Sequence, residues 1–415
     1  MKEILAPAVR VKGFTDSWKQ CKLGEMVNFS KGTGYSKSDL KESGTPIILY
    51  GRLYTKYETI ISDVDTFVDE KPNSVFSEGG EVIVPASGET AEDISVASVV
   101  DQSGVLLGGD LNIVKPPLNL DSSFLAISIS NGKPHHDMAN MAQGKSVVHL
   151  HNSDLAKIDF PYPRYEEQCR ISQYFKSIDH IITLHQRKLD QLKKLKKYFL
   201  QNMFPAKGEK VPRIRFKGFT GDWEQRKLVD IATMHARIGW QNLRTSEFLD
   251  DGDYYLITGT DFKDGRIDFS NCHYVAKERY DQDKNIQIHN GSILITKDGT
   301  LGKVAYISGL NKPATLNAGV FNVVIKANDV DEKYLYHYLA GPFLMDYVSK
   351  RATGGTIKHL NQNILVDFPV VLPSYDEQKK IGETLQDLDN LITLHQRKLN
   401  QLLTMKKFML QNLFI

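Results

Sequence analysis

The chain has 415 residues, more than one ordinary domain contains, so at least two domains are expected. Hydrophobic residues make up 41% and charged residues 25% of the sequence, which is the range of a globular protein. The formal net charge is only +2, so charge balance neither demands nor excludes nucleic acid. A DNA binder with this balance must concentrate its basic residues locally or borrow positive surface from a partner.

The cysteines and the apolar runs narrow the class of protein further. Cys21, Cys169 and Cys272 lie far apart and form neither a CxxC pair nor a zinc spacing, so reduced thiols and no metal site are expected. No stretch approaches the roughly 18 apolar residues of a membrane span, and the first residues hold no signal-peptide core. The sequence therefore predicts a cytoplasmic protein without membrane contact.

The sequence is a tandem repeat. KGFTDSWKQCKL from Lys12 returns as KGFTGDWEQRKL from Lys217, an offset of 205 residues. ITLHQRKL from Ile182 returns unchanged from Ile392, an offset of 210 residues. Each unit is much longer than the solenoid repeats of about 20–50 residues. It opens and closes on shared segments and has a divergent middle.

Each middle is predicted to be a mixed α/β domain, because short β-rich runs alternate with Gly, Asn and Asp turns. The middles keep a common skeleton, in which Gly80–Val84 corresponds to Gly291–Ile295. Trp18 and Trp223 stand at matched positions of the openings and are expected to anchor the cores. The predicted boundaries are a first domain at 1–160 and a second at 216–367.

Each unit closes on a predicted long helix. From Ile171 and from Ile381, apolar residues recur at alternating steps of four and three for about five heptads. Prolines stop the preceding strands, and acidic residues occupy the first turns, where the helix dipole favours them. The predicted helical segments are 161–204 and 368–415, with a linker at 205–215.

The helices are predicted to pack on each other in antiparallel fashion. A helix of about 38 residues is about 57 Å long, whereas the linker reaches about 36 Å at most, so the second domain starts near the far end of the first helix. His185 and His395 are expected to meet near a pseudo-two-fold axis as a polar register-setting pair, not as metal ligands. The predicted helix-pair interface comprises Phe175, Ile178, Ile182, His185, Leu189, Leu192, Leu385, Leu388, Ile392, His395, Leu399 and Leu402.

The predicted fold class is therefore α+β, with two mixed α/β domains separated by a coiled-coil spacer of two long antiparallel helices. Such a spacer can hold two reading heads about one DNA turn, or about 34–36 Å, apart. Because the two middles differ, the two half-sites should differ as well, which predicts a split, non-palindromic target.

These motifs resemble the specificity subunit of type I restriction-modification systems. The resemblance rests on the KGFxxxWxxxKL openings, on YEEQ and YDEQ at Tyr165 and Tyr375, and on ITLHQRKL helices ending in QNMF and QNLF. It covers nearly the whole chain and implies two target-recognition domains that read a bipartite sequence in double-stranded DNA. It also implies partners, namely two methyltransferase (modification) subunits that methylate adenine N6 with S-adenosylmethionine, and restriction subunits that use ATP and Mg.

The sequence contains no motif of an enzyme. Pro116-Pro117 precedes Leu118 and does not match the Asn/Asp-Pro-Pro-aromatic motif of an amino-methyltransferase. Ala139–Ser146 ends like a P-loop, but Ala139 replaces the first Gly. HExxH and GxSxG motifs are absent. We predict no catalytic residue, metal or cofactor in this chain. A DNA-binding protein with its own methyltransferase or nuclease activity is the alternative, and a scaffold without DNA contact is a third hypothesis.

Candidate DNA-reading residues are the polar, basic and aromatic residues of the divergent loops. In the first domain they are Lys31, Tyr35, Lys37, Arg52, Tyr54, Lys56, His135, His136 and Lys145. In the second they are Arg237, Trp240, Gln241, Asn242, Arg244, Thr258, Thr260, Asp261, Lys297, Lys358 and His359. The basic run Lys193–Lys197 is expected to be a solvated helix face; DNA backbone or a partner subunit is the alternative contact.

Overall fold

The computed structural model describes residues 5–142, 148–298, 301–351 and 360–415. The chain forms two compact units. Unit 1 comprises Met1–Gln186 with Arg397–Ile415, and unit 2 comprises Arg187–Gln396. Each unit therefore combines most of one repeat with part of the terminal helix of the other repeat.

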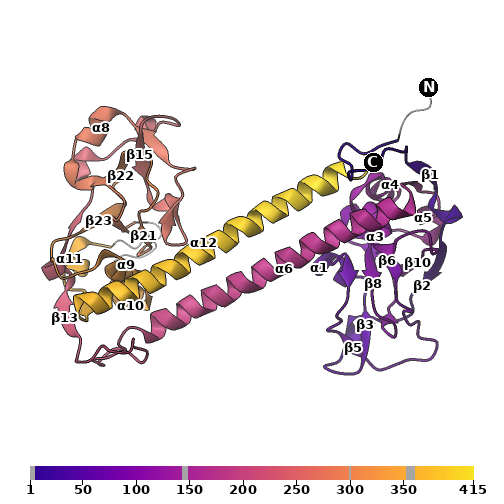
Figure 1. The fold of residues 1–415 in the computed structure, drawn as a ribbon, viewed down its shortest axis with the longest axis horizontal. Helices are drawn as coiled ribbons and strands as arrows, with labels where there is room; N and C mark the ends of the chain where they lie inside the picture. The colour runs from indigo at the N-terminus through magenta and orange to yellow at the C-terminus, as the bar shows by residue number, and fades with distance from the viewer. Residues whose placement is uncertain (1–4, 143–147, 299–300, 352–359) are drawn as a thin grey trace. The chain divides into compact units, whose positions relative to one another are not determined.

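Unit 1 is built on a five-stranded sheet of order β2-β10-β6-β8-β4. Helix α3 covers this sheet, as Figure 1 shows. A smaller sheet, β5-β3-β9, lies at the end of the unit away from α3. The strands are β1 (Lys19–Lys22), β2 (Asn28–Lys31), β3 (Thr45–Ile48), β4 (Ile60–Ile61), β5 (Phe67–Val68), β6 (Glu81–Pro85), β7 (Ser87–Gly88), β8 (Ser98–Val100), β9 (Leu106–Leu107), β10 (Leu111–Lys115), β11 (Val148–His149) and β12 (Asp159–Tyr162). The helices that precede the long one are α1 (Arg52–Thr55), α2 (Ala91–Ile94), α3 (Ser122–Asn131), α4 (Lys133–Met141) and α5 (Asn152–Leu155).

Unit 2 has two four-stranded sheets, of order β14-β23-β20-β21 and β18-β15-β22-β19. The strands are β13 (Glu224–Lys227), β14 (Ala232–His235), β15 (Tyr254–Ile257), β16 (Phe262–Lys263), β17 (Arg266–Ile267), β18 (His273–Val275), β19 (Gln287–Ile288), β20 (Ile293–Thr296), β21 (Val304–Tyr306), β22 (Ala314–Leu316), β23 (Val320–Ile325) and β24 (Pro369–Leu372). The helices are α7 (Leu228–Ile231), α8 (Lys277–Asp281), α9 (Glu332–Ala340), α10 (Pro342–Ser349) and α11 (Gln362–Val366).

The strand register corrects the predicted match between the two middles by one residue. Asn112 of β10 pairs with Val84, and Asn322 of β23 pairs with Leu294. Asn112 and Asn322 correspond at the offset of 210, so Val84 corresponds to Leu294 and not to Ile295. The prediction was wrong by one because the glycine before each strand stands at a different distance from it, and such a slip exchanges the two faces of a strand.

The two long helices are α6 (Tyr165–Asn202) and α12 (Tyr375–Asn412), of 38 residues each. Both begin a few residues later than predicted, because β12 and β24 occupy the start of each predicted helical segment. These strands pair with β1 and β13, so the opening and the end of each middle meet in one two-stranded sheet.

The antiparallel direction of the helices is confirmed inside each unit. In unit 1 the ring of Phe175 lies 6.0 Å from that of Phe414, while Asp179, one turn further along α6, pairs at 2.5 Å with Lys406, two turns earlier on α12. Unit 2 repeats this pairing with Lys196 and Asp389, also at 2.5 Å. The predicted seam residues that are buried are Phe175, Ile178, Leu189, Leu192, Leu385, Leu388, Leu399 and Leu402. Ile182, His185, Ile392 and His395 are half-buried. A direct approach of His185 to His395 remains a prediction.

Candidate nucleic-acid interface

A buried ion pair fixes the start of each long helix. Arg10 donates two hydrogen bonds of 2.8 Å to Glu167, and Arg215 donates two of 2.8 Å to Glu377. Each glutamate side chain is only 1% exposed and stands in the first turn of its helix, where it has an arginine partner in addition to the helix dipole. Sequence reasoning missed the two arginines, although both precede a repeated Lys-Gly-Phe at the same offset.

The same junction is closed by a glutamine in both units. Gln168 accepts from the backbone N–H of Asp121 and donates to the carbonyl of Pro163. Gln378 makes the corresponding bonds with Asp331 and Pro373. Because Asp121 and Asp331 also cap α3 and α9, each recognition middle is locked to its long helix by the same contacts.

The QNxF end of each long helix completes the core of the unit built on the other repeat. In unit 1 the ring of Phe414 lies 5.8 Å from Phe124, and the carbonyl of Asn412 accepts from Val9 N–H. In unit 2 Phe204 lies 5.5 Å from both Tyr334 and Tyr338. The predicted core positions Trp18 and Trp223 are confirmed as buried, at 3% and 5% exposure.

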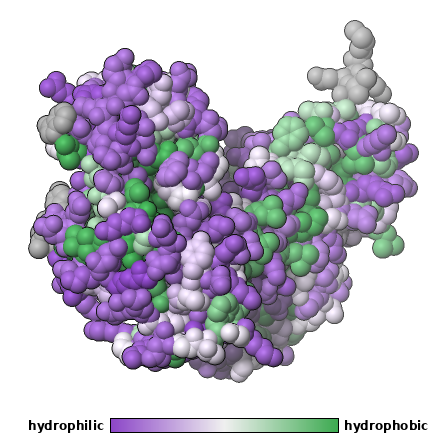
Figure 2. Space-filling view, turned by 60° about the vertical axis from the view of Figure 1, so that its left-hand side comes forward, coloured by the Kyte–Doolittle hydropathy of each residue, from purple (hydrophilic) through white to green (hydrophobic). Residues whose placement is uncertain are grey.

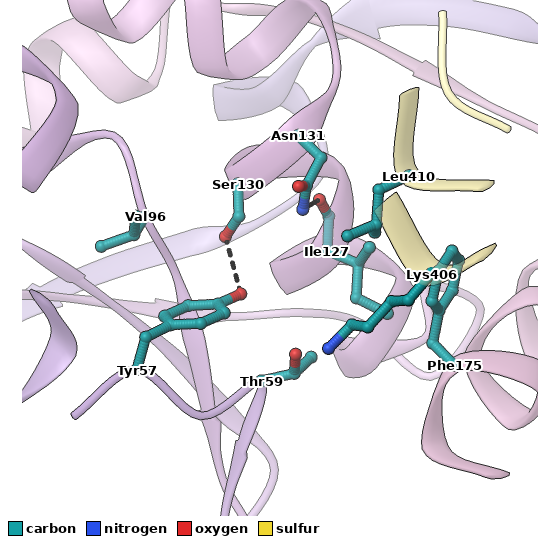
Figure 3. Close-up of a pocket in the computed structure, with 9 residues that line it drawn as sticks. All are labelled: Tyr57, Thr59, Val96, Ile127, Ser130, Asn131, Phe175, Lys406 and Leu410. Atoms are coloured by element: carbon teal, nitrogen blue, oxygen red, sulfur yellow. Dashed lines mark hydrogen bonds between the residues drawn. The ribbon is translucent and has the colours of Figure 1, made fainter. Parts of the chain in front are cut away.

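A small cavity marks the place where α12 packs in unit 1. Figure 3 shows its lining, with the hydroxyl of Tyr57 donating to Ser130 at 3.2 Å and the Lys406 side chain reaching in from α12. Its volume is about 220 Å³. The cavity therefore lies between the domain and the long helices, which contribute Phe175, Lys406 and Leu410 to its lining.

The structure sorts the candidate DNA-reading residues of unit 1. Lys31, Lys37 and His136 are exposed, and no described contact neutralises the two lysines. Tyr54 is half-buried beside Tyr50. His135 lies half-buried with Nδ1 at 2.7 Å from the carbonyl of Ser95.

Three other candidates of unit 1 are already paired inside the domain. The hydroxyl of Tyr35, which is buried, contacts Ser74 at 2.5 Å, so the prediction of a surface aromatic was wrong. Arg52 pairs with Glu58 and Asp65, and Lys56 also pairs with Asp65. Hydrogen bonds from Lys56 and Arg52 lower the pKa of Asp65 to about 2, so the charges of this cluster largely cancel.

In unit 2, Asn242 and Arg244 are exposed, but Arg237 is only 1% exposed and Gln241 5%. The expectation that Arg237 and Gln241 face DNA was therefore wrong, since burial was not visible in a loop of polar residues. Trp240 lies in the short turn Gly239–Gln241, and its side chain is not described.

The remaining candidates of unit 2 lie around the strand ends. Thr258 and Thr260 contact each other at 2.7 Å, and Thr258 N–H donates to the buried Asp261, whose pKa is raised by burial. Lys297 is half-buried, with Nζ 5.5 Å from the centre of the Phe321 ring. Lys145, Lys358 and His359 lie outside the described residues.

Two other kinds of site concern the part of the chain that the structure describes, namely metal centres and membrane spans. There, no group of three or more His, Cys, Asp or Glu side chains could hold a metal ion. None of the helices in the described ranges combines the length and the apolar character of a membrane span.

Two units with the same internal junctions and different loops define a two-headed recognition protein. The chain belongs to the family of the type I restriction modification DNA specificity domain, whose profile matches residues 15–194 and 220–404. The resemblance seen in the sequence is thereby confirmed. The role of this family is DNA specificity and is non-catalytic.

Relatives match over almost the whole chain. The type I restriction enzyme MjaVIII specificity subunit of Methanocaldococcus jannaschii is 21% identical over 403 residues, which is 94% of this chain and 91% of that protein. The EcoBI specificity subunit of Escherichia coli is 21% identical over 413 residues, or 90% and 79%. The S subunit of a type I system from M. genitalium superposes with a TM-score of 0.65 at 15% identity over 99% of both chains, which shows that the fold is shared.

Proposed function

We propose that this chain reads a split, asymmetric DNA sequence and directs adenine-N6 methyltransferase subunits to it. The observation that carries the proposal is the contrast between repeated junctions and different distal sheets. Both units keep the Arg–Glu pair and the glutamine cap, whereas the distal sheet is β5-β3-β9 in unit 1 and β18-β15-β22-β19 in unit 2. Two units that share these junctions but differ in their distal sheets suit two different half-sites.

The reading surface would be the exposed polar loops of each unit. Lys31 and Lys37 in unit 1 can contact phosphates, which position the protein without reading sequence. Asn242 and Arg244 in unit 2 can make bidentate contacts to adenine and guanine edges in the major groove. The buried candidates then shape these loops and do not touch bases.

The long helices carry the proposed surface for the methyltransferase subunits. Among their exposed large apolar side chains, four stand at corresponding positions of each helix beyond its first turn and are exposed by 39–59%: Ile181, Leu184, Leu195 and Tyr198 on α6, and Leu391, Leu394, Met405 and Phe408 on α12. At 3.6 residues per turn, each set falls within a stripe of about 100°. Figure 2 shows how hydrophobic side chains form patches among hydrophilic ones on one face of the molecule.

An exposed apolar stripe of this kind marks a binding surface. In each unit it contributes two apolar residues from α6 and two from α12, which supports one methyltransferase copy per unit. S-adenosylmethionine would be bound by those subunits, and ATP and Mg by restriction subunits. We place the assembly in the cytoplasm.

Methylation mapping tests the proposal directly. The chain is expressed alone and together with its methyltransferase subunit, and methylated adenines are mapped on genomic DNA. We expect one split motif with unlike halves, only when both proteins are present. Methylation by the chain alone would instead support the alternative of an enzyme.

Stoichiometry tests the proposed docking stripe. Leu184→Glu in unit 1 and Leu394→Glu in unit 2 occupy corresponding positions, so each should reduce the bound methyltransferase from two copies to one in native mass spectrometry. The double variant should bind none. Thr183→Glu is the control, because Thr183 is exposed but off the stripe. Two bound copies in the double variant would contradict this surface.

A further inference from the structure

Arg237 leaves the end of β14 and lies beneath the exposed loop that contains Asn242 and Arg244. Its side chain is buried, at 1% exposure, although a guanidinium is always charged. None of its hydrogen-bond partners is a carboxylate. Burial and the neighbouring Arg279 lower the pKa of Arg237. Burying a charge without an opposite charge beside it costs free energy, so the contacts of this guanidinium indicate a specific role.

The guanidinium ties three separate segments together. Nε donates to the carbonyl of Leu316 on β22 at 2.9 Å, and Nη2 donates to the hydroxyl of Thr315 at 3.2 Å. Nη1 reaches the carbonyl of Gln241, in the loop itself, at 3.5 Å, and the side-chain oxygen of Gln282 after α8 at 3.2 Å. The fork geometry of arginine suits such a multiple contact, which one lysine ammonium cannot reproduce.

The other end of the loop is held through the same group of residues. Arg279 accepts from Arg237 Nη2 at 3.5 Å through its carbonyl, and its guanidinium donates to Gln282 at 3.2 Å and to Glu247 at 2.5 Å. Glu247 in turn accepts from the backbone N–H of Arg244 at 2.8 Å. The loop from 238 to 244 is therefore braced at both ends by one connected network.

In unit 1, the loop that follows β2 is held against the distal sheet by a different kind of contact. Counting from the ends of β2 and β14, Thr33 corresponds to Arg237. The backbone N–H of Thr33 donates directly to the carbonyl of Leu107 on β9 at 3.1 Å. The adjacent Gly32 lies so close to this strand that an added Cβ would be 2.0 Å from the carbonyl oxygen of Gly108. Backbone contact holds the loop in unit 1, whereas unit 2 uses a buried side chain.

We propose that Arg237 is a positioning residue that fixes the segment Ile238–Arg244 in the conformation that reads one half of the DNA site. This inference rests on the proposed function. Arg237 touches no base. It acts through the loop, so its loss should alter the bases selected by unit 2 and leave the half-site of unit 1 unchanged.

The test uses the full chain with its methyltransferase subunit and the variant Arg237→Met. Arg226→Met is the matched control, because Arg226 lies in the same unit but pairs with Asp329 at the surface. Amide hydrogen exchange should be at least about tenfold faster over residues 238–244 in Arg237→Met only, which corresponds to about 1.4 kcal/mol. Methylated sites should keep one half of the motif and lose about tenfold in base discrimination in the other.

Two results would overturn the inference. One is unchanged exchange over residues 238–244. The other is fewer methylated sites that still carry the wild-type bases in both halves, as expected if Arg237 only stabilised the unit. If Arg237→Met does not fold, Gln282→Ala removes the acceptor shared by Arg237 and Arg279 and should give the same half-site effect. A wild-type chain that yields no split motif would refute the proposed function instead, so the two failures are distinguishable.

Discussion

Phe204 offers the sharpest test of the way in which each repeat completes the unit of the other. It belongs to the first repeat by sequence, yet its ring is 1% exposed and packs against Tyr334, Tyr338 and Phe343 of the second, at 5.5, 5.5 and 6.0 Å. Truncating a buried Phe to Ala costs about 3–5 kcal/mol. Domain stabilities are about 5–15 kcal/mol, so Phe204→Ala should remove a large share of the stability of unit 2.

Urea unfolding of single-tryptophan variants can assign the loss to a unit. Trp223 lies 6.1 Å from Tyr334 and reports on unit 2 when Trp18 and Trp240 are replaced by Phe. With a slope of about 2 kcal/mol per molar urea, Phe204→Ala should lower the Trp223 midpoint by about 2 M. Phe414→Ala is the control, because Phe414 packs on Phe124 in unit 1. An unmoved Trp223 midpoint in Phe204→Ala would refute the reasoning.

Three further predictions use the same Trp223 transition. Arg215→Met leaves the buried carboxylate of Glu377 without its cation and should lower the free energy of unfolding of unit 2 by about 3–5 kcal/mol at pH 7. Lys196→Met removes the partner of Asp389, which is 10% exposed, and should cost about 2 kcal/mol at the same pH. Burial lowers the pKa of His337 well below its usual range, so the unfolded chain binds a proton that the folded unit does not. Stability should therefore fall by up to about 1.4 kcal/mol per pH unit as pH drops below about 6.5, and His337→Ile should remove that part of the slope.

Matched variants in unit 1 control the first two of these predictions. Arg10→Met and Lys406→Met make the corresponding changes there, so they should shift the transition of Trp18 and leave that of Trp223 in place. For His337 the comparison is the difference between wild type and variant from pH 7.5 to pH 5, because carboxylates far from this side chain titrate equally in both. Asp389 lies 4.0 Å from His337 Nδ1, so the double variants with Asp389→Asn are compared in the same way. Equal slopes in the two proteins would contradict the assignment.

The sequence predicted the parts of the fold that depend on pattern. The heptad stripe and the repeat were enough to predict two long helices, and the short linker between the repeats was enough to predict their antiparallel direction. The matched Trp18 and Trp223 were enough to predict two cores. The sequence could not predict contacts between residues that are far apart in the chain but close in space. Gly382 near the start of α12 is one such position, because an added Cβ would lie 2.7 Å from the backbone nitrogen of Tyr334. The corresponding Ser172 of α6 instead donates to Asp121 at 2.5 Å.

The candidate site was predicted less well, for a physical reason. A loop rich in Arg, Gln and Tyr has the same composition whether its side chains face solvent or brace the loop from inside. Tyr35 and Arg237 were both chosen as DNA contacts, and both are buried. Burial of such groups depends on which carbonyls and hydroxyls lie opposite them, and those come from strands far away in the sequence, such as β22 for Arg237.

The contacts that hold the long helices are separate from the distal sheets and their loops, which explains how one fold can serve many DNA sequences. β2 pairs with β10 in unit 1 as β14 pairs with β23 in unit 2, and the distal sheet of each unit lies between these strands in the sequence. The contacts that hold the long helices come instead from the openings, from the N-caps of α3 and α9, and from the QNxF ends. A change in the distal sheet therefore leaves those contacts intact. Each distal sheet must also hold the neighbouring reading loop in place. In unit 1 the backbone of Thr33 makes this contact, whereas in unit 2 the side chain of Arg237 makes it.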